Sequence, residues 1–165
     1  AHRQGRAVDV NNGLDGEGPM SPERAGTLPT GELINLCFSG RFTREELLRR
    51  VSGHAGLVAY LGTTDMKEIL ARIEAGDEQA RLVVDAMIFQ IAKAIGAEAT
   101  VLYGKVDAIL ITGGMAYAPY ITQRIRERVR FIAPVAVFPG QDEMQALAIN
   151  ALGALRGELE VKTYA

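Results

Sequence analysis

The longest regular pattern of hydrophobic residues lies in the middle of the chain. Between residues 84 and 95, apolar residues recur at intervals of three and four, which is typical of a helix with a buried face. Asp77 stands where a side-chain oxygen can cap the first turn, so we expect the helix to begin directly after it. Neighbouring apolar residues predict that much of the helix circumference is buried. The stripe consists of Val84, Met87, Ile88, Ile91 and Ile95, widened by Val83, Ala86 and Phe89.

The last third of the chain alternates between strand and helix patterns. Residues 106–112 form a nearly continuous apolar run, which is typical of a strand covered on both faces. A helix is expected over about residues 119–129, a second strand over residues 134–138 and a final helix over about residues 143–155. This order, with short connections, predicts parallel strands joined by a right-handed crossover. The final helix is expected to turn Met144, Leu147, Ala148 and Leu152 inward.

The first half of the chain contains shorter elements. Residues 6–10 alternate like a strand, and a loop rich in glycine and proline follows over residues 11–29. Thr43 and Glu46 match the capping box of a helix start. The apolar residues between Gly56 and Gly62 predict a short strand or a buried extended segment. Thr64 and Asp65 then predict a helix that continues to about residue 75.

Length and composition narrow the class of protein. The chain has 165 residues, 48% of them hydrophobic, which suffices for one domain with its own core. Its single cysteine, Cys37, excludes a module held together by internal disulfides. A net charge of -2 gives no general attraction to nucleic acid or to an anionic membrane. The apolar runs are too short to span a bilayer, and the first residues lack the hydrophobic stretch of a signal peptide. We therefore expect a soluble, cytoplasmic domain with neither a nucleic-acid nor a membrane partner.

Two loops lie where parallel sheets bind ligands, at the carboxyl ends of the expected strands. Gly113 and Gly114 follow the first strand, and they can bring the backbone close to a nucleotide phosphate or serve only as a tight turn. Asp142 and Glu143 follow the second strand, where acidic side chains can cap the next helix or bind Mg²⁺. The spacing alone does not separate these alternatives.

The loop over residues 11–29 is longer than most connections in compact domains, and it carries several charged residues, Arg24 among them. It is either a site loop or a mobile surface excursion. His2, His54 and Cys37 lack the spacing of metal ligands. The arginines between residues 124 and 130 occupy alternate positions, which is typical of a solvated helix surface.

Four segments together resemble the butyrate kinases of the acetate kinase family, within the sugar kinase–heat-shock–actin superfamily. They read VDVNNGLDGEGPMSPERAG, GLVAYLGTTDMKEI, AILITGGMAYAPYI and FIAPVAVFPGQDEMQALA, and they occur in this order between about residues 6 and 156. The resemblance implies an α/β, ribonuclease H-like (actin-like ATPase) fold, with a mixed or parallel sheet flanked by helices. It also implies reversible phosphoryl transfer from ATP to a short-chain fatty acid, with ADP and an acyl phosphate as products.

Roles for individual residues follow from this resemblance. Arg24 matches the active-site arginine of the family, and Glu143 matches the carboxylate that helps to position Mg²⁺. Asp65 and Lys67 match an Asp and an Arg beside the ribose and adenine, although lysine lacks the planar guanidinium that stacks on a base. The adenosine loop of the superfamily corresponds to Gly113, Gly114, Met115 and Ala116.

The resemblance also bears on how much of an enzyme the chain represents. In the family, a glycine-rich phosphate hairpin and a whole N-terminal domain precede the matching segments. We therefore expect residues 1–165 to be the C-terminal, nucleotide-side half, inactive alone, dependent on that N-terminal domain and homo-oligomeric. His2 is not matched to the catalytic histidine of the family. The alternative is a non-catalytic, actin-like nucleotide-binding or scaffold module. A hydride-transfer domain is disfavoured because the full glycine fingerprint is missing.

Overall fold

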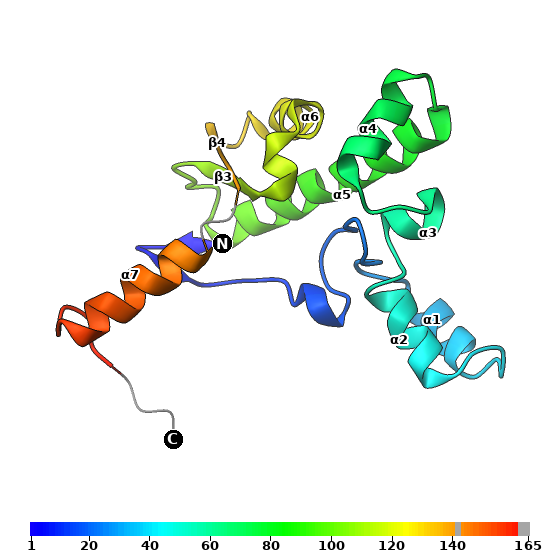
Figure 1. The fold of residues 1–165 in the computed structure, drawn as a ribbon, viewed down its shortest axis with the longest axis horizontal. Coiled ribbons are helices and arrows are strands. Elements are labelled where there is room, and N and C mark those ends of the chain that lie inside the picture. The colour runs from blue at the N-terminus through cyan, green and yellow to red at the C-terminus, as the bar shows by residue number, and fades with distance from the viewer. Residues whose placement is uncertain (141–142, 162–165) are drawn as a thin grey trace.

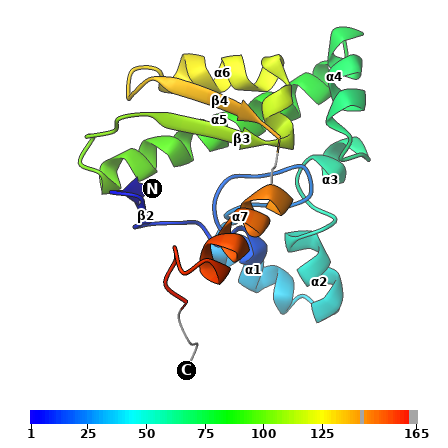
Figure 2. The same ribbon diagram turned by 60° about the vertical axis from the view of Figure 1, so that its left-hand side comes forward.

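The computed structural model describes residues 1–140 and 143–161, with only the backbone described for Glu143. Its elements combine short pieces at the N-terminus with a helix-rich middle and a strand–helix–strand–helix end (Figures 1 and 2). In chain order they are β1 (His2–Arg3), β2 (Arg6–Ala7), η1 (Gly13–Asp15), α1 (Thr30–Cys37), α2 (Arg44–Val51), α3 (Leu57–Leu61), α4 (Met66–Glu74), α5 (Glu78–Val101), β3 (Ile109–Gly113), η2 (Gly114–Tyr117), α6 (Pro119–Val129), β4 (Val135–Pro139) and α7 (Glu143–Leu155).

The core forms where α5 packs against α6, and Figure 1 shows α5 running through the middle of the molecule. Val84, Met87 and Ile88 are fully buried on α5, as the apolar stripe predicts. The wider burial expected around this helix is wrong in part, because Phe89 is 48% exposed. The face of α6 that meets α5 carries Ile121, Ile125 and Val129, and all are buried.

Asp77 caps α5 as predicted, since its Oδ1 accepts the Ala80 N–H at 2.9 Å. Arg72 on α4 donates to Asp77 Oδ2 at 2.8 Å and also to the Leu61 carbonyl at 2.9 Å. The Ala80 N–H and the Arg72 guanidinium lower the pKa of the Asp77 carboxyl. One side chain thus joins the ends of α3, α4 and α5.

The two long strands, β3 and β4, pair in parallel with Ile109 opposite Val135, which confirms the predicted direction. Ile109 and Ile111 face the core formed with α5 and α6. Leu110, on the opposite face, is 66% exposed. The expectation that both faces of this strand are covered is therefore wrong for the described residues, because α5 and α6 contribute to one core on one face.

Three further expectations differ from the structure. The segment Leu57–Leu61 is a short helix and not a strand, because the Leu57 and Val58 N–H groups donate to the Ser21 and Pro22 carbonyls at the start of a turn. The first strand is shorter than residues 6–10: Arg6–Ala7 pairs only with His2–Arg3.

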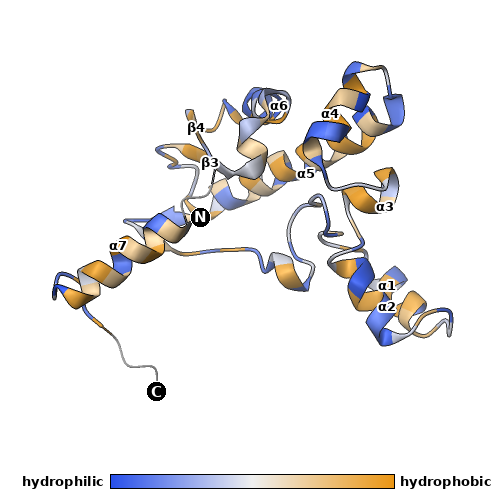
Figure 3. Cartoon of the chain, viewed as in Figure 1, coloured by the Kyte–Doolittle hydropathy of each residue, from blue (hydrophilic) through white to orange (hydrophobic). Residues whose placement is uncertain are grey.

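The third difference concerns α7. Met144, Leu147, Ala148 and Leu152 were expected to face inward, and all four are exposed. Figure 3 shows apolar residues along this helix, which extends away from the core. An apolar helix surface of this kind is typical of an element that packs against another part of a protein.

No helix in the described ranges 1–140 and 143–161 is both long and apolar enough to cross a bilayer.

Candidate functional site

Arg24 lies in a tight, hydrogen-bonded turn that begins at Ser21. The Ser21 hydroxyl oxygen accepts the N–H of Arg24 at 3.1 Å, and the Ser21 N–H donates to the Arg24 carbonyl at 3.1 Å. A serine hydroxyl that bonds to the backbone in this way stabilises a turn locally. The middle of the glycine- and proline-rich loop is therefore an ordered turn in this structure.

Residues 51–58 hold this turn from the other side. The Gly53 N–H donates to the Glu23 carbonyl at 2.8 Å, and the Leu57 N–H donates to the Ser21 carbonyl at 3.1 Å. Arg24 also forms an antiparallel bridge with Ser52. The backbone around Arg24 is thus fixed by the end of α2 and the start of α3, which a sequence pattern does not reveal.

Gly56 makes this close approach possible. Its φ of +64° is unfavourable for any residue with a Cβ, and a Cβ there would lie 1.9 Å from the Ser21 carbonyl oxygen. The same Cβ would lie 2.6 Å from the Arg24 carbonyl oxygen. Glycine is required at this position because backbone occupies the space of a side chain.

The Arg24 guanidinium has unused hydrogen-bonding capacity. Its Nε is buried and has no hydrogen-bond partner among the described residues. The nearby Nη1 lies 3.3 Å from the position that a Cβ would take at Gly13, so the side chain rests against η1. No carboxylate within the described ranges forms an ion pair with Arg24. A buried, unpaired N–H of a cation is costly, and a carboxylate or phosphoryl oxygen would satisfy it.

Gly113 ends β3 in a conformation that suits glycine, with φ +88° and ψ −178°. It exchanges two backbone hydrogen bonds of 3.1 Å with Gly140 at the end of β4. Gly114 comes next, is exposed, and has open space where a Cβ would stand. The conformation of Gly113 thus forms the turn, and the absence of a side chain at Gly114 leaves the backbone accessible to a ligand. Met115 is half-buried and Ala116 is buried, so both support η2.

Tyr117 is a residue at this loop that the sequence did not single out. Its hydroxyl oxygen lies 2.7 Å from the position that a Cβ would take at Gly140, while the side chain as a whole is 68% exposed. The aromatic ring therefore stands beside the ends of both strands. An aromatic residue three positions after the Gly113–Gly114 pair was the available signal.

Asp65 has a structural role at the start of α4, where its Oδ1 accepts the N–H groups of Lys67 at 2.9 Å and Glu68 at 3.5 Å. This confirms the predicted helix start. Both Asp65 and Lys67 are exposed and accessible to a ligand. The described contacts are those of a helix cap, and a role beside a nucleotide stays a prediction.

Glu143 begins α7, but its side chain lies outside the described residues, as do Gln141 and Asp142. The described ranges contain no group of three or more His, Cys, Asp or Glu residues that could hold a metal ion. Mg²⁺ that is shared with phosphate oxygens needs only one or two carboxylates, and Glu143 has suitable donor chemistry. Its assignment to magnesium stays a prediction.

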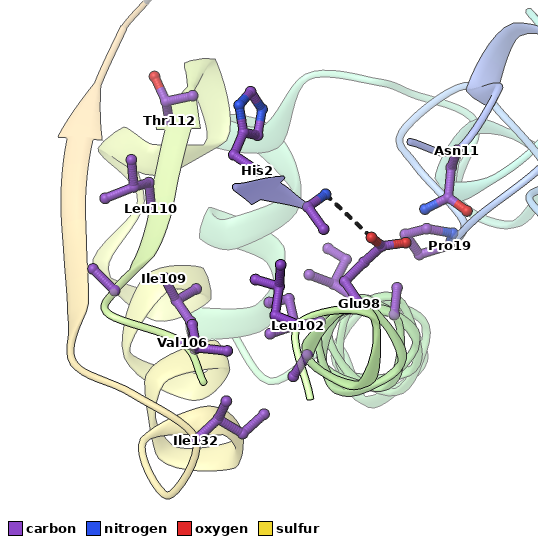
Figure 4. A pocket seen from close by; sticks show the side chains of 16 residues that line it. His2, Asn11, Pro19, Glu98, Leu102, Val106, Ile109, Leu110, Thr112 and Ile132 are labelled. Carbon is purple, nitrogen blue, oxygen red and sulfur yellow. Dashed lines mark hydrogen bonds and ion pairs between the residues drawn. The ribbon is translucent and has the colours of Figure 1, made fainter. Parts of the chain in front are cut away.

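A hollow of about 720 Å³ lies between α5 and β3 and is lined mainly by apolar residues (Figure 4). Glu98 at its wall pairs with the Ala1 amino group at 3.1 Å, and Leu110 and Thr112 lie on the opposite side. None of the predicted site residues lines it. Arg24, Asp65 and residues 113–116 instead occupy three separate turns, and Figure 2 shows β3 and β4 pointing toward the side on which α3 lies.

Comparison with known protein families identifies the family to which this chain belongs. A family model described as the acetokinase family matches residues 1–136. The chain belongs to the acetokinase family. The match includes the Arg24 turn, Asp65 and residues 113–116 at the end of β3, and it ends before Glu143.

A curated relative of this acetokinase-family chain is the "Probable butyrate kinase" of Bacteroides thetaiotaomicron. It is 62% identical over 163 residues, which cover 99% of this chain and 46% of the relative. The chain thus spans about half the length of the curated relative that it matches.

Solved structures of the family share the fold. Acetate kinase from Porphyromonas gingivalis superposes with a TM-score of 0.75 at 23% identity, over 84% of this chain and 41% of that structure. Acetate kinase from Entamoeba histolytica gives a TM-score of 0.70 at 20% identity, over 82% and 43% of the two chains. A propionate kinase from Francisella tularensis gives 0.68 at 20% identity, over 79% and 39%. These likenesses confirm the predicted α/β, actin-like fold class.

Proposed function

We propose that residues 1–165 are the C-terminal, nucleotide-side half of a short-chain fatty acid kinase that acts on butyrate or a similar acid. The reaction is ATP plus fatty acid to ADP plus acyl phosphate, and it is reversible. Membership of the acetokinase family and 62% identity to a probable butyrate kinase support the reaction class. The structural observation that carries the proposal is the buried Nε of Arg24, which has no hydrogen-bond partner among the described residues and lies on a hydrogen-bonded turn.

In the proposed reaction, a carboxylate oxygen of the acid forms a bond to the γ-phosphorus of ATP. The bond from that phosphorus to the oxygen bridging the β-phosphate breaks, and ADP leaves with the electron pair. The protein needs to position two anions and stabilise the charge on the transferring group. A guanidinium can do both, because its N–H groups match carboxylate and phosphoryl oxygens in a bidentate manner.

The nucleotide is proposed to lie at the end of β3 and the start of α4. Gly113, Gly114, Met115 and Ala116 would approach the adenosine, and Asp65 and Lys67 would lie beside the ribose and adenine. Glu143 would hold Mg²⁺, which neutralises phosphate oxygens when it is bound. Completion of the site by an N-terminal domain, and assembly of more than one copy, are part of the same proposal. The exposed apolar residues of α7 support the proposal that another domain or another copy covers this helix.

The decisive experiment measures acyl phosphate directly. The full-length protein, incubated with butyrate, ATP and Mg²⁺, is expected to form butyryl phosphate that hydroxylamine traps as the hydroxamate. Chelation of Mg²⁺ should abolish formation, and residues 1–165 alone should give no product. Nucleotide binding without acyl phosphate from any short-chain acid would contradict the kinase and support a non-catalytic module.

Asp65 allows the nucleotide role to be separated from helix capping. Asp65→Asn keeps a good cap but removes the charge, so thermal stability should change little while the KM for ATP rises several-fold. Asp65→Ala should also lose the cap, worth about 1 kcal/mol of stability. Asp77→Asn is the matched control, because it makes the same change at the start of α5 and should leave the KM for ATP unchanged. An unchanged KM in Asp65→Asn would remove Asp65 from the nucleotide site.

A further inference from the structure

Gln90 on α5 makes a contact that spans a large distance along the chain. Its side-chain Oε1 accepts the backbone N–H of Met20 at 2.8 Å, in a partly buried position. The side chain of Met20 is itself buried, with 7% exposure, and belongs to the hydrophobic core. The amide of Gln90 thus ties the glycine- and proline-rich loop to the longest helix.

The loop segment around Met20 is folded tightly on itself. The Thr27 N–H donates to the Gly18 carbonyl at 2.9 Å, and the Gly18 N–H donates to the Thr27 hydroxyl at 3.1 Å. Gly26 has φ +74°, and a Cβ there would lie 2.6 Å from the Met20 nitrogen. Arg24 lies between these closures, so a displacement of Met20 is transmitted to the turn that carries Arg24.

We propose that Gln90 is a positioning residue for Arg24. It acts by fixing the Met20 backbone and does not need to touch a substrate. The inference rests on the proposed role of Arg24 in phosphoryl transfer. Most other hydrogen bonds to the backbone around Arg24 come from residues 51–58. Gln90 adds a hydrogen bond from the side of α5.

Loss of the hydrogen bond between the Met20 N–H and Gln90 is expected to displace the loop. Without an acceptor at residue 90, the N–H of Met20 would be unpaired in a partly buried place, and the loop would move to find a partner. Phosphoryl transfer relies on the placement of charge, and a displacement of about 1 Å can reduce a rate by about 100-fold. The residues proposed to bind the adenosine, Gly113 to Ala116, lie on a different turn, so the KM for ATP is expected to change little when this loop moves.

The test compares two substitutions of similar length and good helix propensity in the full-length protein. Gln90→Met lacks the acceptor and should lower kcat for acyl phosphate formation by about 10- to 100-fold, with the KM for ATP unchanged within about twofold. Gln90→Glu retains an acceptor oxygen and should restore most of kcat. Gln79→Met is the matched control, because Gln79 is exposed on the same helix, and it should behave as the unmodified protein. Gln90→Lys, which also lacks an acceptor, replaces Gln90→Met if that variant fails to fold.

A double-mutant cycle separates positioning from general destabilisation. In an Arg24→Ala background, Gln90→Met should cause no further loss of kcat, because the group that Gln90 positions is gone. An equal loss in both backgrounds, or an unchanged kcat in Gln90→Met alone, would overturn the inference. If Arg24→Ala by itself leaves kcat unchanged, it is the proposed role of Arg24 that fails, and the two failures are thus distinguishable.

Discussion

Replacing Arg24 with alanine is expected to lower kcat for acyl phosphate formation in the full-length protein by about 10³-fold. Arg24 presents a buried guanidinium nitrogen with no described partner, on a turn fixed by hydrogen bonds from three directions. Loss of such a preorganised cation removes charge stabilisation that is greatest in the transition state. The KM for the fatty acid should also rise, because the carboxylate loses its counter-charge.

Two variants make this result specific. Arg24→Lys keeps the charge but loses the planar fork, so it should recover only part of the lost rate. Arg124→Ala removes an arginine from an ion pair with Asp85 at 3.3 Å on the outer surface, where the side chain is 40% exposed. It should leave kcat unchanged and cost less than about 1 kcal/mol of stability. Hydroxamate formation at saturating ATP measures all three, and equal rates for Arg24→Ala and the unmodified protein would contradict a catalytic Arg24.

Elements with local signals could be predicted from the sequence. The capping box of Thr43 and Glu46 is present, with the Thr43 N–H bonded to the Glu46 carboxylate at 2.8 Å. Asp65 and Asp77 begin the helices expected of them, and Pro119–Val129 has the bounds that its pattern predicts. In each case the residues that determine the structure lie within one or two helical turns, so a short window of sequence contains the cause.

Features that depend on contacts distant in sequence could not be predicted in this way. Residues 57–61 form a helix because their first N–H groups find carbonyls of Ser21 and Pro22 in another part of the chain. Gln90 is one of several polar residues of α5, and the sequence does not reveal that it bonds to the N–H of Met20. The exposure of Leu110 likewise depends on which elements cover the sheet, and the amino-acid pattern of the strand does not specify them.

The residues of the candidate site show the same difference between local signals and contacts distant in sequence. Gly113 could be predicted as a turn residue from its position after an apolar strand, and its φ of +88° agrees. The importance of Arg24 came from resemblance to a family, since a lone arginine in a loop has no distinctive spacing. The structure adds an independent physical reason, namely a buried nitrogen without a partner among the described residues. It also reveals that Gly56, which the sequence marks only as the boundary of an apolar run, is what allows the turn to form.

Gly56→Ala is therefore expected to be among the most damaging substitutions of a small residue in this chain. The new Cβ would lie 1.9 Å from the Ser21 carbonyl oxygen and 3.0 Å from the Arg24 nitrogen, and both are backbone atoms that cannot rotate away. The backbone angles of φ +64° and ψ −141° lie in a region that residues with a Cβ rarely adopt, which adds conformational strain of about 1–3 kcal/mol. Together with overpacking, the expected loss of unfolding free energy is about 3–5 kcal/mol. Chemical denaturation of the full-length protein measures it.

Gly62→Ala is the control for placing a Cβ at a positive φ without a steric collision. Gly62 ends α3 with φ +79°, but a Cβ there would meet nothing within 4 Å. Its substitution should cost only about 1–2 kcal/mol, the contribution of the left-handed backbone alone. Any Gly56→Ala protein that remains folded should also lose acyl phosphate formation more severely than Gly62→Ala, because the turn that yields to the new methyl group carries Arg24. Equal stability of the two variants would mean that the close approach of Gly56 to Ser21 does not hold this turn.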